Sequence, residues 1–240
     1  MKKIGLIGGL SYLSSIEYYK IINEEVQKSL GGHHSAPIVL YSLDFDPIAN
    51  AMFNNDWGFV KLELIKAVEY LRASDCTFIA ICCNSVHKVF DEVEVEVESQ
   101  SKLFHIIEPT INIIARMGLK KVGLLGTKFT MAEKFHEPYL KKYEIDVLTP
   151  NIDLHEKINE IIFSEICHER LIKASKRFLL DVAQDLIQKG AEGIILACTE
   201  LPTVIKSEDL DTILFSTTDI HAKAIAKILM AKSTGIELIA

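Results

Sequence analysis

The 240-residue chain is 49% hydrophobic and 25% charged, which is the balance of an ordinary globular protein and excludes a disordered or fibrous chain. Its 33 acidic and 26 basic residues give a formal net charge of −7, which disfavours surfaces that bind nucleic acids or anionic membranes. We therefore expect neither a nucleic-acid nor a membrane partner. Five cysteines cannot all pair, and a chain of this length needs no disulfides, so we expect reduced thiols in a cytoplasmic protein.

The first residues, MKKIGLIGGLSYL, imitate a secretory signal because two lysines precede a short apolar run. Gly8 and Gly9 interrupt the run, and no small-residue cleavage pattern follows. A helical pattern comes next, with apolar residues expected on one face: Ile16, Tyr19, Ile22 and Val26. No run of about 18 apolar residues occurs that could span a bilayer. These features again favour a cytoplasmic protein.

Short apolar runs alternate with longer helical patterns along the whole chain. The runs fall at 4–7, 38–43, 78–83, 104–107, 122–126, 145–148, 193–198 and 213–216. Near-continuous apolar runs are typical of parallel strands that are buried on both faces. The sequence therefore predicts an α/β fold with parallel sheets covered by helices.

Two of the intervening segments illustrate the predicted covering helices. In 61–74 the predicted buried face consists of Leu62, Ile65, Val68 and Leu71. In 177–190 a helical pattern ends at Gly190, a residue type that often terminates helices. The segment 91–99, DEVEVEVES, alternates with the period of a strand but follows a predicted helix, so we interpret it as a helix end or a solvated excursion.

The chain contains an internal repeat. KKIGLIGGLSYLSS at 2–15 is echoed by KKVGLLGTKFTMAE at 120–133, and ASDCTFIAICCNSVHK at 73–88 is echoed by GAEGIILACTELP at 190–202. The repeat predicts two pseudo-symmetric α/β domains with an active site in the cleft between them, because open α/β sheets bind ligands at the carboxyl ends of their strands. We expect the last helical stretch to return to the first half. The predicted domains are therefore 1–110 plus 217–240, and 111–216.

Each copy of the repeat places a cysteine at the carboxyl end of a strand, Cys83 in the first and Cys198 in the second. The residues that follow are suited to starting helices, and a helix N-terminus favours a thiolate. A single cysteine in a strand is more often simply part of the core, but two at corresponding positions favour a catalytic pair. If one is a thiolate and the other a thiol, they can remove a proton from a carbon acid and return one to its opposite face.

The remaining motifs favour a small-molecule site without a metal. Cys76, Cys82, Cys83 and His87 are irregularly spaced and do not match the ligand pattern of a zinc site. The turns GLIGGLS and GLLGTKFT match neither a dinucleotide-binding motif nor a P-loop. They do offer backbone amides and hydroxyls that could hold a carboxylate: Ser11, Thr127 and Thr130. Helix capping is the alternative role for Ser11 and Thr130.

The segments GGLSYLSS at 8–15, CNSVH at 83–87, LLGTKFT at 124–130 and ACTELP at 197–202 resemble the aspartate/glutamate racemase family. The resemblance implies two α/β domains, a homodimer, no pyridoxal phosphate or other cofactor, and an amino-acid substrate. It also implies that Cys83 and Cys198 are the acid/base thiols. The residues that it places around the substrate's carboxylate and amine are Asn84, Ser85, Thr127, Thr199 and Glu200.

One departure concerns the substrate. Cys167 stands where aspartate-selective members carry a basic residue, so the chain is more similar to the broad-specificity branch of the family. The sequence therefore predicts an amino-acid racemase, with aspartate and glutamate as the first substrates to test. Two alternatives remain open, namely a maleate-isomerase-like enzyme that uses one thiol as a nucleophile, and a non-catalytic protein that binds small acids.

Overall fold

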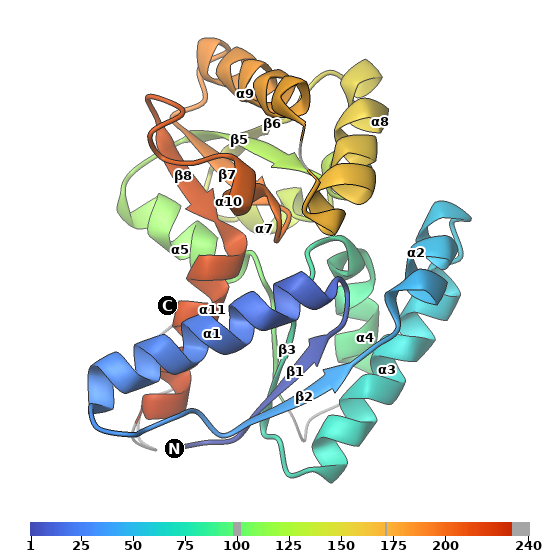
Figure 1. Ribbon diagram of the computed structural model, residues 1–240, viewed down its shortest axis with the longest axis vertical. Helices are drawn as coiled ribbons and strands as arrows, with labels where there is room; N and C mark the ends of the chain where they lie inside the picture. The colour runs from blue at the N-terminus through green and yellow to red at the C-terminus, as the bar shows by residue number, and fades with distance from the viewer. Residues whose placement is uncertain (98–101, 171, 232–240) are drawn as a thin grey trace. The chain divides into compact units, whose positions relative to one another are not determined.

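The computed structural model describes residues 1–97, 102–170 and 172–231, and the chain forms two compact units. Unit 1 consists of Met1–Ile106 and His221–Ala240, and unit 2 of Ile107–Ile220. Each unit has a four-stranded parallel sheet flanked by helices (Figure 1). This arrangement confirms the predicted α/β class.

Unit 1 has the strand order β2-β1-β3-β4, so its first strand lies inside the sheet. Its strands are β1 (Ile4–Gly8), β2 (Ile38–Ser42), β3 (Phe78–Ile81) and β4 (Lys102–Phe104). Its helices are α1 (Tyr12–Leu30), α2 (Phe45–Phe53), α3 (Trp57–Ala73), a 3₁₀ helix (Ser85–Val89), α4 (Phe90–Glu96) and most of α11 (Thr217–Met230).

Unit 2 has the order β6-β5-β7-β8, which repeats the order of unit 1. Its strands are β5 (Lys121–Gly126), β6 (Asp146–Leu148), β7 (Gly193–Ala197) and β8 (Ile213–Ser216). Its helices are α5 (Glu108–Arg116), α6 (Lys128–Ala132), α7 (Glu137–Lys141), α8 (Ile152–Glu160), α9 (Lys173–Gln188) and α10 (Leu201–Val204). The predicted repeat is thus present in the topology, with β3 and β7 at equivalent positions.

Seven of the predicted apolar runs contain most of a strand, and the eighth is displaced. The predicted run 104–107 begins where β4 ends. Ile106 and Ile107 are fully buried in the connection that leads to α5, so their apolar character reflects burial rather than strand structure. Burial and strand formation leave the same signal in a short run.

Alternate residues of β1 in the unit 1 sheet face helices on opposite sides of the sheet. On one face, Ile4 and Leu6 belong to a buried cluster with Tyr18 and Ile22 of α1 and Leu229 of α11. On the other face α3 packs closely, because the Leu71 side chain occupies the space beside Gly5. Both faces are therefore covered, which explains why the strands are apolar without alternation.

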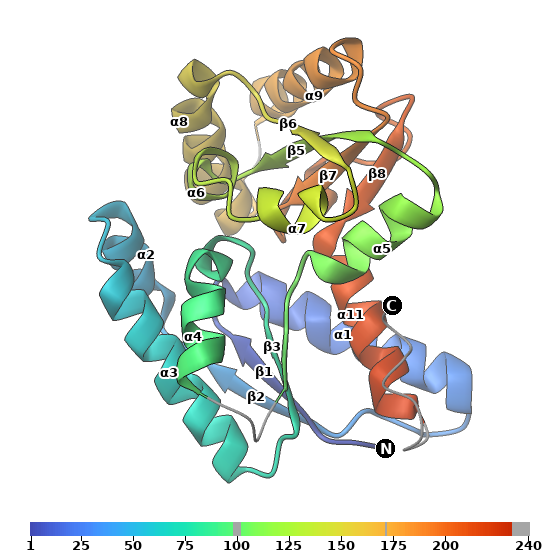
Figure 2. The ribbon, with the colours of Figure 1, turned by 180° about the vertical axis from the view of Figure 1, so that it is seen from behind.

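Unit 2 has its own apolar core. Figure 2 shows α9 on one side of the sheet and α5 and α7 on the other. Leu186 of α9 packs beside Gly123 of β5, and Leu140 of α7 and Ile114 of α5 are fully buried in the same cluster. Gly190 has a φ of 95° just beyond α9, which confirms that it ends this helix.

Two predicted helix faces are shifted. In α1, Ile16 and Tyr19 are each 54% exposed, whereas Ser14, Ser15 and Tyr18 are buried. The first turns of α1 thus turn polar groups inward, toward the end of the sheet. In α3 the buried residues are Val60, Leu64, Ala67, Val68 and Leu71, while Leu62 is exposed. The segment 91–97 continues α4 and its following turn, which confirms a helix end, and residues 98 and 99 lie outside the described residues.

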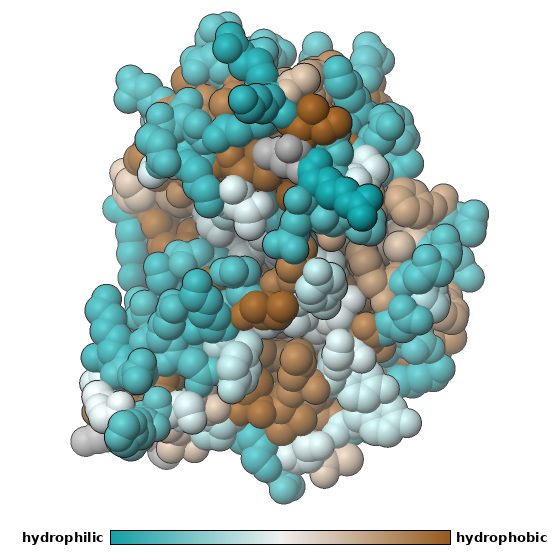
Figure 3. All heavy atoms as spheres, viewed as in Figure 1, coloured by the Kyte–Doolittle hydropathy of each residue, from teal (hydrophilic) through white to brown (hydrophobic). Residues whose placement is uncertain are grey.

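Figure 3 shows mainly hydrophilic residues on one face, with apolar side chains gathered over the edge strand β2, where Leu40 is 43% exposed. Among the described residues, no helix combines the length and the apolar character that a membrane crossing requires.

Candidate active site

The two predicted cysteines occupy equivalent places in the two units. Cys83 follows β3 and Cys198 follows β7, which are the third strands of their sheets. All nine predicted site residues are buried. Unit 1 brings Ser11, Cys83, Asn84 and Ser85 to the carboxyl edge of its sheet, and unit 2 brings Thr127, Thr130, Cys198, Thr199 and Glu200 to the same edge of its own.

In unit 1, the glycine turn after β1 shapes the edge of the sheet. Gly9 has a φ of 81°, and a Cβ there would collide with the backbone of Leu43. The backbone N–H of Gly9 donates to Ser15 Oγ at 2.8 Å, and Ser14 Oγ donates to the Cys82 carbonyl at 2.5 Å. The inward polar face of α1 therefore fixes the turn and the end of β3. Ser11 occupies the N-cap position of α1 without a capping side-chain hydrogen bond, so capping does not explain its hydroxyl.

His87 holds the chain beside Cys83. Its Nε2 accepts a hydrogen bond from the Ile106 N–H at 3.2 Å, so the proton of the neutral ring lies on Nδ1, which donates to the Cys83 carbonyl at 2.7 Å. The ring stacks on Phe90 with centroids 5.2 Å apart. Burial, the dominant cause, lowers its pKa to about 4. His87 is therefore neutral near pH 7 and has both nitrogens engaged with the backbone.

A second buried pair joins α1 to α11. Tyr18 Oη lies 2.8 Å from His221 Nδ1, and the two rings meet edge to face. Burial raises the pKa of Tyr18 well above its ordinary value and lowers that of His221 to about 3. Near pH 7 the phenol therefore keeps its proton and the imidazole is neutral, and a hydrogen bond joins the two groups.

In unit 2, Thr127 stands where Ser11 stands in unit 1. It is the N-cap of α6 with φ −66° and ψ 162°, against −67° and 165° at Ser11. Thr127 Oγ1 accepts a hydrogen bond from the Thr130 N–H at 3.4 Å and lies 3.2 Å from Thr130 Oγ1. Thr127, rather than Thr130, is thus the capping residue.

The Cys198 thiol has a carboxylate partner. Cys198 Sγ donates to Glu200 Oε2 at 3.1 Å, and Thr199 Oγ1 donates to the same oxygen at 2.6 Å. Burial raises the pKa of Cys198 well above its ordinary value, and the charges of Glu200 and Cys167 act in the same direction. The expected lowering by a helix N-terminus is present only as the smaller effect of the Glu200 backbone N–H, and burial outweighs it. The following helix, α10, spans only Leu201–Val204, so its dipole is small.

Five buried side chains of unit 1 make hydrogen bonds at or near the carboxyl end of its sheet and were not predicted from the sequence as supporting groups. They are Ser14, Ser15, Tyr18, His87 and His221. Their signal was present as polar residues at the start of a helix and histidines in apolar surroundings, but these residue types also occur on surfaces. None of the five cysteines, all in the described part of the chain, forms a disulfide, and Cys76 and Cys82 are buried in the core. The described residues contain no group of three or more His, Cys, Asp or Glu side chains that could hold a metal ion.

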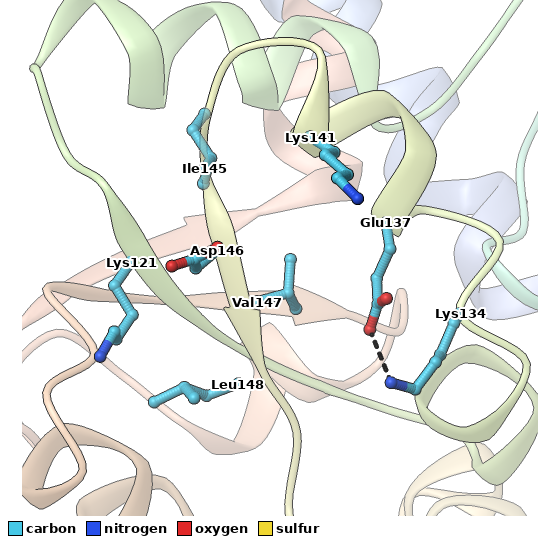
Figure 4. A pocket seen from close by; sticks show the side chains of 8 residues that line it. All are labelled: Lys121, Lys134, Glu137, Lys141, Ile145, Asp146, Val147 and Leu148. Atoms are coloured by element: carbon cyan, nitrogen blue, oxygen red, sulfur yellow. Dashed lines mark ion pairs between the residues drawn. The ribbon is translucent and has the colours of Figure 1, made fainter.

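A separate pocket of about 440 Å³ lies on unit 2 beside β6 and α7 (Figure 4). Lys121 and Asp146, which line it, are the first residues of β5 and β6, and Lys134 pairs with Glu137 at 3.2 Å. The pocket therefore extends to the amino ends of the strands, whereas Cys198 follows the carboxyl end of β7. None of the predicted site residues lines it.

The sequence profile of the Asp/Glu/Hydantoin racemase family matches residues 7–225. The chain belongs to this family. Membership supports racemase activity and thus an isomerase, and the two-unit α/β fold agrees with it.

Solved structures of similar proteins extend this family assignment. The chain is 38% identical to a candidate Asp/Glu racemase from Yersinia pestis, with a TM-score of 0.87 over 96% of this chain and 100% of that chain. It is 32% identical to an aspartate racemase homologue from Pyrococcus horikoshii OT3, with a TM-score of 0.80 and the same coverage. Among curated proteins, the broad specificity amino-acid racemase RacX of Bacillus subtilis is 24% identical over 84% of this chain and 87% of its own length. The family's fold thus extends over nearly the entire chain.

Proposed function

We propose that the protein is a cofactor-independent amino-acid racemase that uses Cys83 and Cys198 as its acid/base pair. Family membership supports racemisation. The observation that carries the assignment of the thiols is their equivalence, since each follows the third strand of one of two sheets with the same strand order. A pair of opposed proton-transfer groups suits a reaction that must act on both faces of one carbon.

In the proposed reaction, a thiolate removes the α-proton, and the electrons of the C–H bond pass into the carboxylate to give an enediolate. The other thiol then donates its proton to the opposite face of the α-carbon, the carboxylate re-forms, and the configuration is inverted. Hydroxyls and amides at the sheet edges, including those of Ser11 and Thr127, stabilise the negative charge that develops on the carboxylate. Asn84, Ser85, Thr130 and Thr199 complete the proposed substrate contacts.

We propose aspartate and glutamate as the first substrates, with broad tolerance of the side chain. Cys167 supplies no cation for a second carboxylate, and the Bacillus subtilis relative is described as a broad specificity racemase. On the family resemblance alone, we also propose that the protein acts as a homodimer in the cytoplasm.

The decisive experiment incubates the wild-type protein with separate L- and D-amino acids in D₂O and follows the α-proton signal by NMR. We expect exchange of the α-proton together with formation of the opposite enantiomer. Cys83→Ala and Cys198→Ala should each lower racemisation by at least about a thousandfold, because each removes one proton-transfer group. Cys76→Ala, which alters a core thiol, should retain near wild-type turnover if it folds.

Other outcomes separate the alternatives. Wild-type turnover in either single site variant contradicts the two-thiol mechanism. Amino-acid binding by calorimetry without α-proton exchange indicates a non-catalytic binding protein. A covalent adduct of a maleate-like substrate on one cysteine, detected by mass spectrometry, indicates nucleophilic isomerase chemistry.

A further inference from the structure

The contacts of Glu200 differ from those of a residue that simply binds substrate. Its side chain is buried, and one carboxylate oxygen, Oε2, accepts hydrogen bonds from both Cys198 Sγ and Thr199 Oγ1. In the shared hydrogen bond the Cys198 thiol is the donor and the Glu200 oxygen is the acceptor, so the proton between the two groups lies on the sulfur. The geometry therefore favours Cys198 as a thiol.

The groups around Cys198 act on its proton in opposite directions. Within unit 2, the titratable groups that affect the thiol are the side chains of Glu200 and, to a smaller extent, Cys167, and the Coulombic interaction with each disfavours a thiolate at Cys198. The backbone N–H of Glu200 acts in the opposite direction, since it hydrogen-bonds to the sulfur. Residue 200 thus provides a group for each protonation state, with its carboxylate accepting from the thiol and its amide donating to the thiolate.

We propose that Glu200 is a positioning residue that keeps the proton on Cys198 in the free protein, rather than a substrate-binding residue. Cys198 is then the resting proton donor, and Cys83 is the thiol available to act as the base. This inference rests on the proposed racemase function for its catalytic meaning, but its central statement concerns only the proton on Cys198.

A protonated Cys198 in the free protein should make the kinetic constants of the two enantiomers unequal. After Cys198 has donated its proton, a thiolate stands beside a carboxylate, which is an unfavourable pair of like charges. The free protein should therefore bind more readily the enantiomer whose proton Cys83 removes. That enantiomer should have the lower KM and also the lower kcat. The ratio of kcat/KM for the two enantiomers stays at unity, because the equilibrium constant of a racemisation is one.

The direct test measures the pH midpoint for alkylation of Cys198 by iodoacetamide, using mass spectrometry of the peptide that contains it. The midpoint reports ionisation of the thiol and is independent of how slowly the reagent reaches a buried sulfur. In the wild type we expect a midpoint above that of an ordinary thiol. Glu200→Gln keeps a hydrogen-bond acceptor but removes the charge, so the midpoint should fall by at least one pH unit, a tenfold change in the ionisation constant.

Two matched variants complete the design. Glu200→Asp retains the charge and should restore most of the wild-type midpoint, whereas Glu208→Gln, which removes a carboxylate from the exposed loop after α10, should leave it unchanged. In the racemisation assay, Glu200→Gln should shift the alkaline limb of kcat to lower pH and move the KM ratio of the two enantiomers toward one.

The outcomes distinguish this inference from the proposed function. An unchanged alkylation midpoint in folded Glu200→Gln overturns the role of Glu200. If that variant does not fold, a wild-type midpoint at or below about 8.5, the ordinary thiol value, overturns it as well. A shifted midpoint in a protein that racemises no amino acid leaves the proton assignment intact and refutes the racemase proposal.

Discussion

Single residues near the two cysteines show how burial selects the groups that can carry charge. His87 follows Cys83 by one helical turn, a position from which a histidine could act as a general base. In the structure, however, one ring nitrogen accepts from a backbone N–H and the other donates to the Cys83 carbonyl. A second ring proton would point at the Ile106 N–H, which already occupies that site. The ring is thus a rigid connection between the cysteine loop and the chain after β4.

Stability should consequently depend on pH through His87. Its pKa is about 4 in the folded protein, against about 6.5 in an unfolded chain. Between these values the unfolded state binds more protons, so the free energy of unfolding falls as the pH decreases from 6.5 to 4, by up to about 3 kcal/mol. Above pH 6.5 the contribution is complete and constant. Urea unfolding at several pH values, followed by circular dichroism, measures this dependence.

The matched variants are His87→Gln, which replaces the buried ring with a side chain that does not titrate, and His33→Gln, which alters an exposed histidine of the same unit. The first should reduce the slope of unfolding free energy against pH in this window, and the second should not. Equal slopes in the wild type and His87→Gln would show that other groups dominate. His221, whose pKa is about 3, contributes in the same direction and remains in both variants.

At the scale of elements, the turn between β1 and α1 depends on one glycine. Gly9 adopts a φ of 81°, and a Cβ there would meet the backbone of Leu43. Gly9→Ala should therefore cost more than the 1–2 kcal/mol of backbone strain alone, at roughly 3 kcal/mol or more. Gly118→Ala provides the control, because Gly118 has a φ of 73° but nothing within 4 Å of the added Cβ. Comparable losses of unfolding free energy in the two variants would show that the contact with Leu43 is unimportant.

The elements also show which parts of the structure the sequence could predict. Strands such as β1 and β5 were predictable because a parallel strand covered on both faces is apolar throughout. The prediction did not have to decide which side chains face the core. For a helix, in contrast, the prediction must decide which stripe of side chains faces the core. α3 carries apolar residues on two adjacent stripes, and only packing against Gly5 of the sheet selects the one that contains Leu64 and Leu71.

In the candidate site, too, some features could be predicted from the sequence and others could not. The equivalent positions of Cys83 and Cys198 in the two units could be predicted because an internal repeat marks them. The partner of Cys198 could not, since a glutamate two residues after a cysteine can bind substrate, face solvent or accept the thiol proton. Only the side-chain conformation shows that Glu200 Oε2 lies 3.1 Å from Sγ. Likewise, nothing in the sequence indicates that Ser14 turns inward to the Cys82 carbonyl.

At the scale of the whole molecule, the chain enters unit 1 twice. Residues 1–106 form the sheet and most of its helices, and the chain returns at His221 after completing unit 2. The returning helix contributes Ala222, Ile225 and Leu229 to the core that α1 and β1 share. The N–H of Lys2 also donates to the Leu229 carbonyl at 3.3 Å. Unit 1 therefore depends on a segment that is synthesised after all of unit 2.

This dependence predicts that a substitution near the C-terminus destabilises the N-terminal sheet. Leu229→Ala removes a buried side chain from unit 1 and should cost about 2–5 kcal/mol. Hydrogen exchange should then accelerate in peptides from β1 and α1, while peptides from β5 and β7 keep their protection. Leu186→Ala makes the same chemical change in the core of unit 2 and should give the reverse pattern. Equal acceleration in both units for either variant would mean that the two units unfold as one.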